Sequence, residues 1–255
     1  MRSALFLTAL AVSTFATACG GGDGGKASFG DAVEYESEGV DPVRAEFAAP
    51  EGAEDVPGVL LVHQFNGDSS QWSDFAPRLV AEGYAVLAPD LDYAGISDCR
   101  PTDTITGGGR QDECRQLVDD LLRDVKGGID YLKTRPEVDP ETIAVIGASF
   151  GANLAYLASG LFNDVDTAVA LSPNSSPPAR VLVGEGFEEF APRSMLFISD
   201  EKEGADSTTL AIGVGQPLDV KIYVGGPAHG VELLKLEEPV KDLFAWLKER
   251  LKAGR

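Results

Sequence analysis

The chain has 255 residues, enough for one large core, and its 44% hydrophobic and 24% charged residues are typical of a globular protein. Acidic residues outnumber basic residues by 41 to 21, so the formal net charge is -20. Nucleic acids and anionic lipid surfaces repel a chain this acidic. The charge therefore argues against a DNA-binding, RNA-binding or peripheral-membrane protein.

The first 18 residues have the pattern of a signal peptide. Arg2 supplies a basic start, an apolar run extends from Ala4 to Ala16, and small residues precede Cys19. The run is too short to span a bilayer as a permanent helix. We therefore expect residues 1–18 to be removed from an exported protein.

The Ala-Thr-Ala-Cys junction that ends at Cys19 resembles a bacterial lipobox. The resemblance implies a diacylglycerol on Cys19, which would anchor the exported protein at the outer side of the cytoplasmic membrane or in the periplasm. Residues 19–31 would then form the attachment site and a Gly-rich tether. Ordinary secretion is the alternative, because Ala16-x-Ala18 also fits a standard signal-peptidase site.

Eight short runs rich in Val, Ile and Leu predict β-strands in the rest of the chain. Several are apolar throughout, as strands buried on both faces of a parallel sheet must be. In chain order the runs are Val33–Tyr35, Val43–Phe47, Val59–Val62, Tyr84–Ala88, Thr142–Ile146, Thr167–Leu171, Met195–Ile198 and Val220–Val224. The first two, joined by a turn around residues 38–42, predict an antiparallel edge.

Helical periodicity separates the later strands. One helix face comprises Val118, Leu121, Leu122, Val125, Ile129 and Leu132, and a second comprises Val240, Leu243, Phe244, Leu247 and Leu251. We expect Gly127 and Gly128 to let the first helix approach the sheet closely. Strands that alternate with helices predict a doubly wound, mostly parallel sheet in a single domain over residues 32–255.

Cys99 and Cys114 are the two remaining cysteines, and they lie in and beside a polar, Gly-rich stretch, residues 95–110, that is typical of a loop. In an exported domain we expect them to form a disulfide. Two separate thiols are the alternative. The chain has only two histidines, neither near these cysteines in the sequence, so we expect no metal site.

The segment Gly147-Ala148-Ser149-Phe150-Gly151 lies between a predicted buried strand and a predicted helix. In that context the Gly-x-Ser-x-Gly pattern predicts a nucleophile elbow, since small neighbours allow a strained turn that exposes the Ser oxygen. The helix N-terminus also favours a developing oxyanion. A phosphate-binding or purely structural turn is the alternative interpretation.

A serine nucleophile needs a base, and His229 follows the last predicted strand and the nucleophile in chain order, as the elbow arrangement requires. A solvated loop histidine is the alternative. His63 precedes Ser149, so we expect it to shape the oxyanion loop instead. The N–H groups of Phe65 and Phe150 are the expected oxyanion donors.

These motifs resemble the α/β-hydrolase superfamily, in particular the dienelactone-hydrolase-like and prolyl-oligopeptidase-like branch of small serine esterases. The matching segments are residues 63–67, Pro89–Leu91, residues 139–151, Leu171–Pro173 and Pro227–Gly230. The resemblance covers roughly residues 32–251. It implies the α/β-hydrolase fold, an eight-stranded sheet with helices on both faces, and a small-molecule ester substrate without a cofactor.

Two positions depart from that pattern. Gln64 stands where many relatives have glycine after the histidine, which bears on the geometry of the oxyanion loop. Ser149 stands where true dienelactone hydrolases have a cysteine nucleophile, so we do not expect that reaction.

The acid that orients His229 should follow the seventh strand, and the residues alone leave Asp200, Glu201, Glu203 and Asp206 open. The resemblance favours Glu203, because the acid of such esterases commonly lies a few residues beyond the strand. Asp200 would then be a turn residue or a helix cap, and Asp206 the cap of the next helix.

The sequence therefore predicts an exported serine hydrolase that cleaves carboxylic esters through an acyl-enzyme on Ser149. A tethered, non-catalytic binding domain with the same fold is one alternative. A small serine peptidase is another, although only a short segment follows the sixth strand, which leaves little surface for a peptide.

Overall fold

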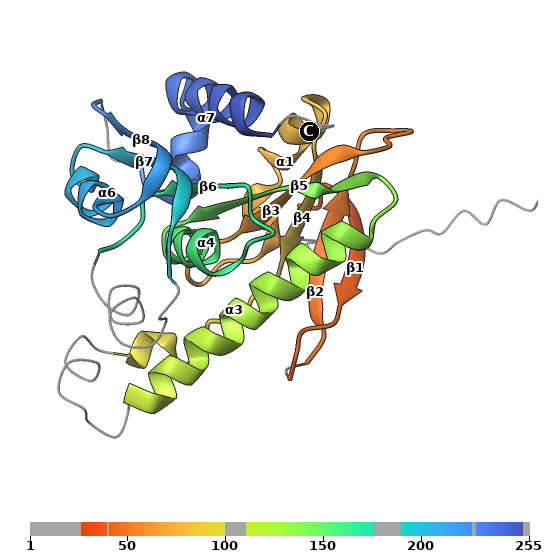
Figure 1. Ribbon diagram of the computed structural model, residues 1–255, viewed down its shortest axis with the longest axis horizontal. Coiled ribbons are helices and arrows are strands. Elements are labelled where there is room, and N and C mark those ends of the chain that lie inside the picture. The colour runs from red at the N-terminus through yellow and green to blue at the C-terminus, as the bar shows by residue number, and fades with distance from the viewer. Residues whose placement is uncertain (1–26, 40, 100–110, 176–189, 226–227, 252–255) are drawn as a thin grey trace, which may run out of the picture.

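A computed structural model describes residues 27–39, 41–99, 111–175, 190–225 and 228–251 (Figure 1). Eight strands form one sheet in the order β1-β2-β4-β3-β5-β6-β7-β8. Their bounds are β1 Asp31–Tyr35, β2 Val43–Ala48, β3 Val56–Val62, β4 Ala85–Pro89, β5 Val138–Ala148, β6 Thr167–Leu171, β7 Arg193–Asp200 and β8 Gly215–Tyr223.

Most of the sheet is parallel. Among the described strands, β1 pairs with β2 and β2 pairs with β4 in antiparallel fashion, and the pairs from β4 through β3 to β8 are all parallel. The predicted mostly parallel sheet of eight strands, with an antiparallel edge made by the first two, is confirmed. Neighbouring parallel strands therefore end at the same edge of the sheet.

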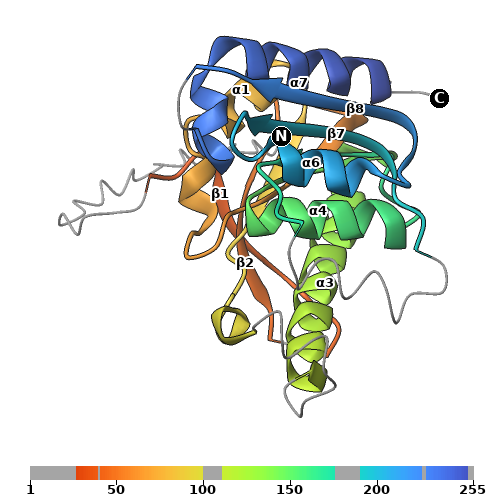
Figure 2. The ribbon, with the colours of Figure 1, turned by 90° about the vertical axis from the view of Figure 1, so that its left-hand side faces the viewer.

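Helices cover both faces of this sheet. The α-helices are α1 Ala76–Ala81, α3 Gln111–Thr134, α4 Phe150–Leu161, α6 Gly204–Ala211 and α7 Glu237–Arg250, and the short 3₁₀ helices are η1 Ser69–Trp72, η2 Ile96–Asp98 and η3 Gly230–Lys235. Figure 2 shows α1 and α7 on one side of the sheet and α3, α4 and α6 on the other.

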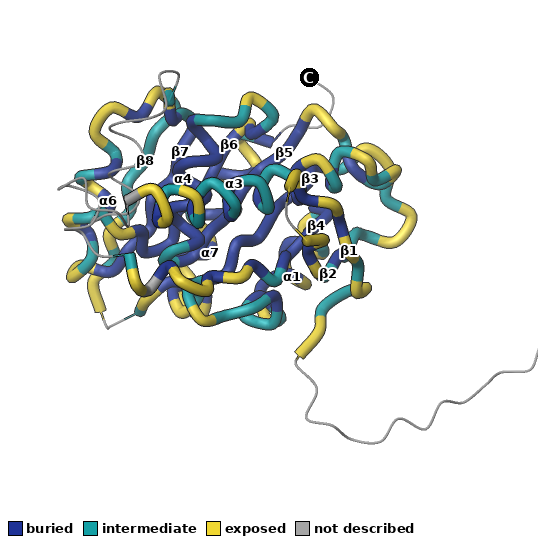
Figure 3. Tube along the Cα trace, turned by 90° about the horizontal axis from the view of Figure 1, so that it is seen from below, coloured by how far each residue is buried: buried dark blue, intermediate teal, exposed yellow. Residues whose placement is uncertain are grey.

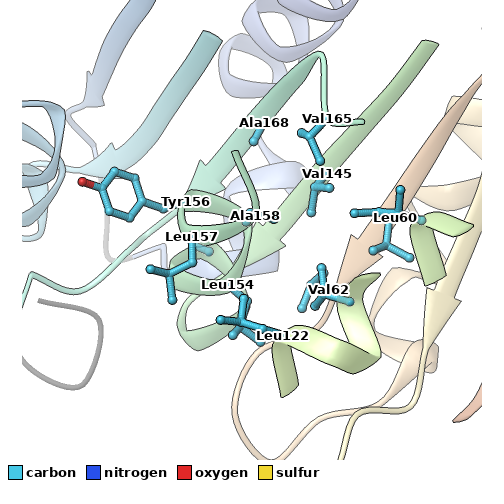
Figure 4. Close-up of a cluster of buried hydrophobic side chains, with 14 of the residues drawn as sticks. Leu60, Val62, Leu122, Val145, Leu154, Tyr156, Leu157, Ala158, Val165 and Ala168 are labelled. Atoms are coloured by element: carbon cyan, nitrogen blue, oxygen red, sulfur yellow. The ribbon is translucent and has the colours of Figure 1, made fainter. Parts of the chain in front are cut away.

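The core is divided into two layers by the sheet. Along β3, Leu60 and Val62 belong to the layer under α3 and α4, whereas Val59 and Leu61 belong to the layer under α1 and α7. Figure 3 shows the buried strands between more exposed helices and loops. In Figure 4, Leu154 of α4 lies near Val62 and near Leu122 of α3.

The close approach predicted for Gly127 and Gly128 of α3 is confirmed. A Cβ on Gly127 would lie 2.7 Å from the carbonyl oxygen of Glu36, and one on Gly128 would lie 2.9 Å from Cδ1 of Leu60. Larger side chains at these positions would push α3 away from β1 and β3.

Some sequence predictions fall on residues that the structure does not describe, and two others differ from the structure in detail. The signal peptide and Cys19 lie outside the described residues, as do residues 100–110. The expected tether reaches residue 31, but the fold begins earlier, since the N–H of Phe29 donates to Glu46 (2.8 Å) and Asp31 pairs with Phe47. The expected loop at residues 95–110 contains the short helix η2.

None of the described helices is long and apolar enough to cross a membrane.

Candidate active site

The predicted site residues gather at the carboxyl ends of the parallel strands, where open α/β sheets bind their ligands. His63 follows β3, Ser149 follows β5, and Glu203 lies three residues beyond the end of β7. His229 follows β8 and precedes η3. The topology therefore brings together residues that are separated by more than half of the chain.

Ser149 occupies the strained turn that the sequence predicts. Its backbone φ is 52° and ψ is -116°, and it stands at the N-cap of α4. A Cβ on Gly147 would lie 1.9 Å from the carbonyl oxygen of Gly151, and one on Gly151 would lie 2.3 Å from that of Val62. Only glycine fits at either position, so the two glycines of the motif are a physical requirement of this turn.

His229 is paired with Glu203. The Nδ1 atom of His229 lies 2.7 Å from Oε1 of Glu203, and the side chains are 50% and 31% exposed, respectively. A carboxylate in this position accepts the Nδ1 proton, which leaves Nε2 free to act as a base. Of the four acidic candidates, the structure pairs Glu203 with the imidazole.

The other acidic candidates have other partners or surroundings. Asp200 is buried, and its Oδ1 accepts the N–H groups of Lys202 (2.9 Å) and Glu203 (3.1 Å), so it orders the turn that carries Glu203. The predicted capping role of Asp206 is wrong. Glu203 occupies the N-cap position of α6, and Asp206 lies in the first turn, where its carboxylate accepts the N–H of Ser175. Glu201 is exposed.

Residues 229–230 pack directly against the strained turn at Ser149. Gly230, which follows His229, has a φ of +56°, and a Cβ there would lie 3.4 Å from Cβ of Ala148 and 2.4 Å from Oε1 of Gln64. No hydrogen bond joins the side chains of Ser149 and His229 in the described part of the chain. Such bonds are often long before a substrate binds and tighten afterwards.

His63 is a buried residue that fixes the backbone of residues 63–67, the expected oxyanion loop. Its Nε2 accepts the N–H of Leu91 (3.0 Å), which assigns the proton to Nδ1, and Nδ1 donates to the carbonyl oxygen of Gln64 (2.9 Å). Burial is the largest cause that lowers the pKa of His63 below its usual value. The structure therefore gives His63 the shaping contact expected from the sequence.

Two further residues hold this loop, and sequence reasoning did not single them out. The hydroxyl of Tyr93 donates to the carbonyl oxygen of His63 (2.7 Å), and Oε1 of Gln71 accepts the N–H of Gln64 (3.2 Å). Tyr93 follows the Pro89–Leu91 motif, which gave a weak signal for it. No signal in the sequence marked Gln71, because its contact depends on how η1 packs against the loop that contains Gln64.

These contacts determine where the expected oxyanion donors point. The carbonyl of Gln64 is held by His63, and in a trans peptide the following N–H, that of Phe65, points the opposite way. Among the described residues, no hydrogen bond engages that N–H. Phe150 is the first residue of α4, where N–H groups have no acceptor within the helix. The rings of Phe65 and Phe150 both pack on Tyr93, with centroids 5.9 and 5.1 Å apart.

The expected cysteine pair also lies at bonding distance. The Sγ atoms of Cys99, after η2, and Cys114, in α3, are 2.17 Å apart. Within the described residues, no group of three or more His, Cys, Asp or Glu side chains is arranged to hold a metal ion.

The sequence model of the Dienelactone hydrolase family matches residues 43–185, more than half of the chain. The chain belongs to the dienelactone hydrolase family. The matched region includes residues 63–67 and Ser149, but it ends before Glu203 and His229. The placement of these two residues rests on the sheet topology and on the contact between them.

The chain is also similar to individual curated proteins over part of its length. The chain is 31% identical to Protein usf of Aquifex pyrophilus over 139 residues, 53% of this chain and 58% of the relative. It is 34% identical to the quorum-quenching protein AidA of Acinetobacter baumannii over 98 residues, 37% of this chain and 28% of the relative. The chain thus spans about half the length, or less, of these curated relatives.

Solved structures show the fold. A dienelactone hydrolase from Anabaena variabilis superposes with a TM-score of 0.60 at 20% identity, over 87% of this chain and 98% of that chain. An acetyl xylan esterase from Paenibacillus superposes with a TM-score of 0.64 at 16% identity, over 86% and 83% of the two chains. This dienelactone hydrolase family member therefore has the α/β-hydrolase fold, and its family is one of hydrolases.

Proposed function

We propose that this protein is a serine hydrolase that cleaves carboxylic esters through an acyl-enzyme on Ser149. The observation that carries the proposal is the contact between His229 and Glu203, at the same sheet edge as the strained elbow of Ser149. A histidine oriented by a carboxylate beside a serine of this geometry is the arrangement that activates a hydroxyl nucleophile.

In the first half of the reaction, Nε2 of His229 takes the hydroxyl proton as Oγ of Ser149 attacks the ester carbonyl carbon. Glu203 stabilises the imidazolium that forms. The C–O bond to the alcohol then breaks, and His229 gives its proton to the leaving oxygen. In the second half, water attacks the acyl-enzyme with His229 again as base, which releases the acid and restores Ser149.

The negative oxygen of each tetrahedral intermediate would be bound by the N–H groups of Phe65 and Phe150. Removal of one such donor typically costs about 10²–10³ in kcat. The side chains of His63, Tyr93 and Gln71 support this proposal, because they fix the peptide groups before Phe65.

Ester hydrolysis is tested by steady-state assays with p-nitrophenyl esters of increasing acyl length and with aminoacyl anilides. We expect ester turnover, and we expect Ser149→Ala to retain less than about 1% of it, since loss of a nucleophile typically costs far more than that. Ser159→Ala is a matched control, because Ser159 is buried in α4 and its hydroxyl donates to a carbonyl of its own helix. Turnover of anilides alone would favour a peptidase, and no turnover of either would favour a binding domain.

We also propose that the protein is exported and anchored through a lipid on Cys19. The signal-peptide pattern supports this, as does the close approach of Cys99 and Cys114, since disulfides persist mainly in oxidising compartments. Intact-mass analysis of the membrane fraction should show an acylated N-terminal Cys19, and the acyl mass should be absent from Cys19→Ser. Unacylated, soluble protein that begins at Cys19 would contradict anchoring.

A further inference from the structure

The last residue of β6 and the residue after it contact Ser149, the strand that leads to Glu203, and the residue that follows His229. The carbonyl oxygen of Leu171, the last residue of β6, accepts the N–H of Ser149 (2.8 Å). The N–H of Ser172 donates to the carbonyl oxygen of Ile198 in β7 (2.8 Å), the strand whose end leads to Glu203. Ser172 therefore sits between the strands that carry the nucleophile and the acid.

The side chain of Ser172 reaches residues 229–230, which carry the proposed base and are called the base segment below. Its Oγ accepts the N–H of Gly230 at 3.0 Å, and both residues are buried. Gly230 directly follows His229, so this bond fixes the backbone position from which the imidazole projects. A buried N–H group without an acceptor costs free energy. The bond to Ser172 therefore favours this one position of the segment.

The backbone conformation of Ser172 is one that a serine rarely adopts. Its φ is +52°, a region that glycine adopts freely and other residues rarely adopt. Glycine would relieve the strain but would remove Oγ. The hydroxyl contact with Gly230 is the feature of Ser172 that a glycine could not supply.

We propose that Ser172 is a positioning residue for catalysis, which sets the place of His229 relative to Ser149 by holding the N–H of Gly230. The proposal rests on the proposed function, since it assigns a role in that reaction. Ser172 does not touch the reacting atoms. Its hydroxyl acts through the backbone of the base segment.

Ser172→Gly is the informative variant, because it keeps the backbone conformation and deletes only the acceptor. Ser194→Gly is its matched control. Ser194 is also a buried serine with a φ of +52°, but it lies at the start of β7, at the opposite end of the strands. Both variants relieve the same backbone strain, so a general effect on the fold should appear in both.

Two readouts separate positioning from folding. The first is the second-order rate of Ser149 labelling by a fluorophosphonate, together with kcat and KM for a p-nitrophenyl ester. We expect Ser172→Gly to lower the labelling rate and kcat by about 10–100-fold with KM nearly unchanged, as a small misplacement of a catalytic group does. Ser194→Gly should match the wild type. The second readout is amide hydrogen exchange at Gly230, which should become faster only in Ser172→Gly.

Wild-type labelling, kcat and Gly230 exchange in Ser172→Gly would overturn the positioning role. Equal losses in Ser172→Gly and Ser194→Gly would also overturn it, because the effect would then come from the backbone and not from the hydroxyl. Failure of the proposed function would look different. The wild-type protein itself would resist the fluorophosphonate, or Ser149→Ala would be labelled equally well.

Discussion

Two carboxylates at the end of β7 have different partners, and this difference gives a test at the scale of single residues. Asp200 accepts two backbone N–H groups, whereas Glu203 contacts the imidazole of His229. Glu203→Gln should lower kcat by ~10⁴, because the amide favours the wrong histidine tautomer. Asp200→Asn keeps a carbonyl oxygen for both N–H groups and should stay close to wild type. Steady-state kinetics of the two amide variants, each checked for folding by circular dichroism, decide between them. An active Glu203→Gln with an inactive Asp200→Asn would reverse the assignment.

His63 should make stability depend on pH. Burial lowers its pKa in the folded protein, so between the unfolded value of about 6.5 and that lower pKa only the unfolded chain binds the proton. Above pH ~6.5 the titration of His63 does not change the free energy of unfolding. Below that pH this free energy falls, by at most about 1.4 kcal/mol per pH unit.

Urea denaturation at pH 7.5, 6.5 and 5.5 measures this effect, with His63→Asn as the comparison, since an amide can donate to Gln64 without titrating. The wild type should lose stability relative to the variant as the pH falls. Parallel pH profiles for the two proteins would show that His63 is not held neutral. An NMR titration of the His63 ring in the wild type gives the same pKa directly.

At the scale of secondary-structure elements, the strands could be predicted because burial on both faces leaves a clear mark in the sequence. β6, for example, has the predicted bounds Thr167–Leu171. The contacts of Asp206 and Gln71 could not be predicted, because each joins a short helix to a loop, and local sequence patterns do not show where the two meet. The choice of Glu203 over Asp200 likewise depended on family resemblance, since spacing alone left both open.

The link between η2 and α3 gives a test at this scale. Cys99 and Cys114 are separated by 15 positions, and a disulfide that closes a loop of this length stabilises a protein by about 3 kcal/mol on the chain-entropy account. Urea denaturation of the Cys99→Ser/Cys114→Ser double variant should show a loss of this order. A reducing agent should destabilise the wild type and leave the double variant unchanged. Alkylation of two thiols in the unreduced, unfolded wild type would contradict the disulfide.

For the whole molecule, the order of the strands matters more than any one motif. The family match covers residues 63–67 and the turn at Ser149, while Glu203 and His229 lie beyond it. Parallel pairing from β3 through β8 brings these late residues to the edge that carries Ser149. The fold and the strained turn at Ser149 could thus be predicted from local patterns, whereas the contact between His229 and Glu203 is a property of the assembled sheet.

The central claim is that Ser149 is the nucleophile of this sheet edge, and a fluorophosphonate tests it most directly. Attack by Oγ of Ser149 on phosphorus displaces fluoride and leaves a stable phosphonyl ester on the enzyme. Peptide mass spectrometry of the treated wild type should place one adduct on Ser149, and Ser149→Ala should carry none. An unmodified wild type, or an adduct on another residue that persists in Ser149→Ala, would contradict the account.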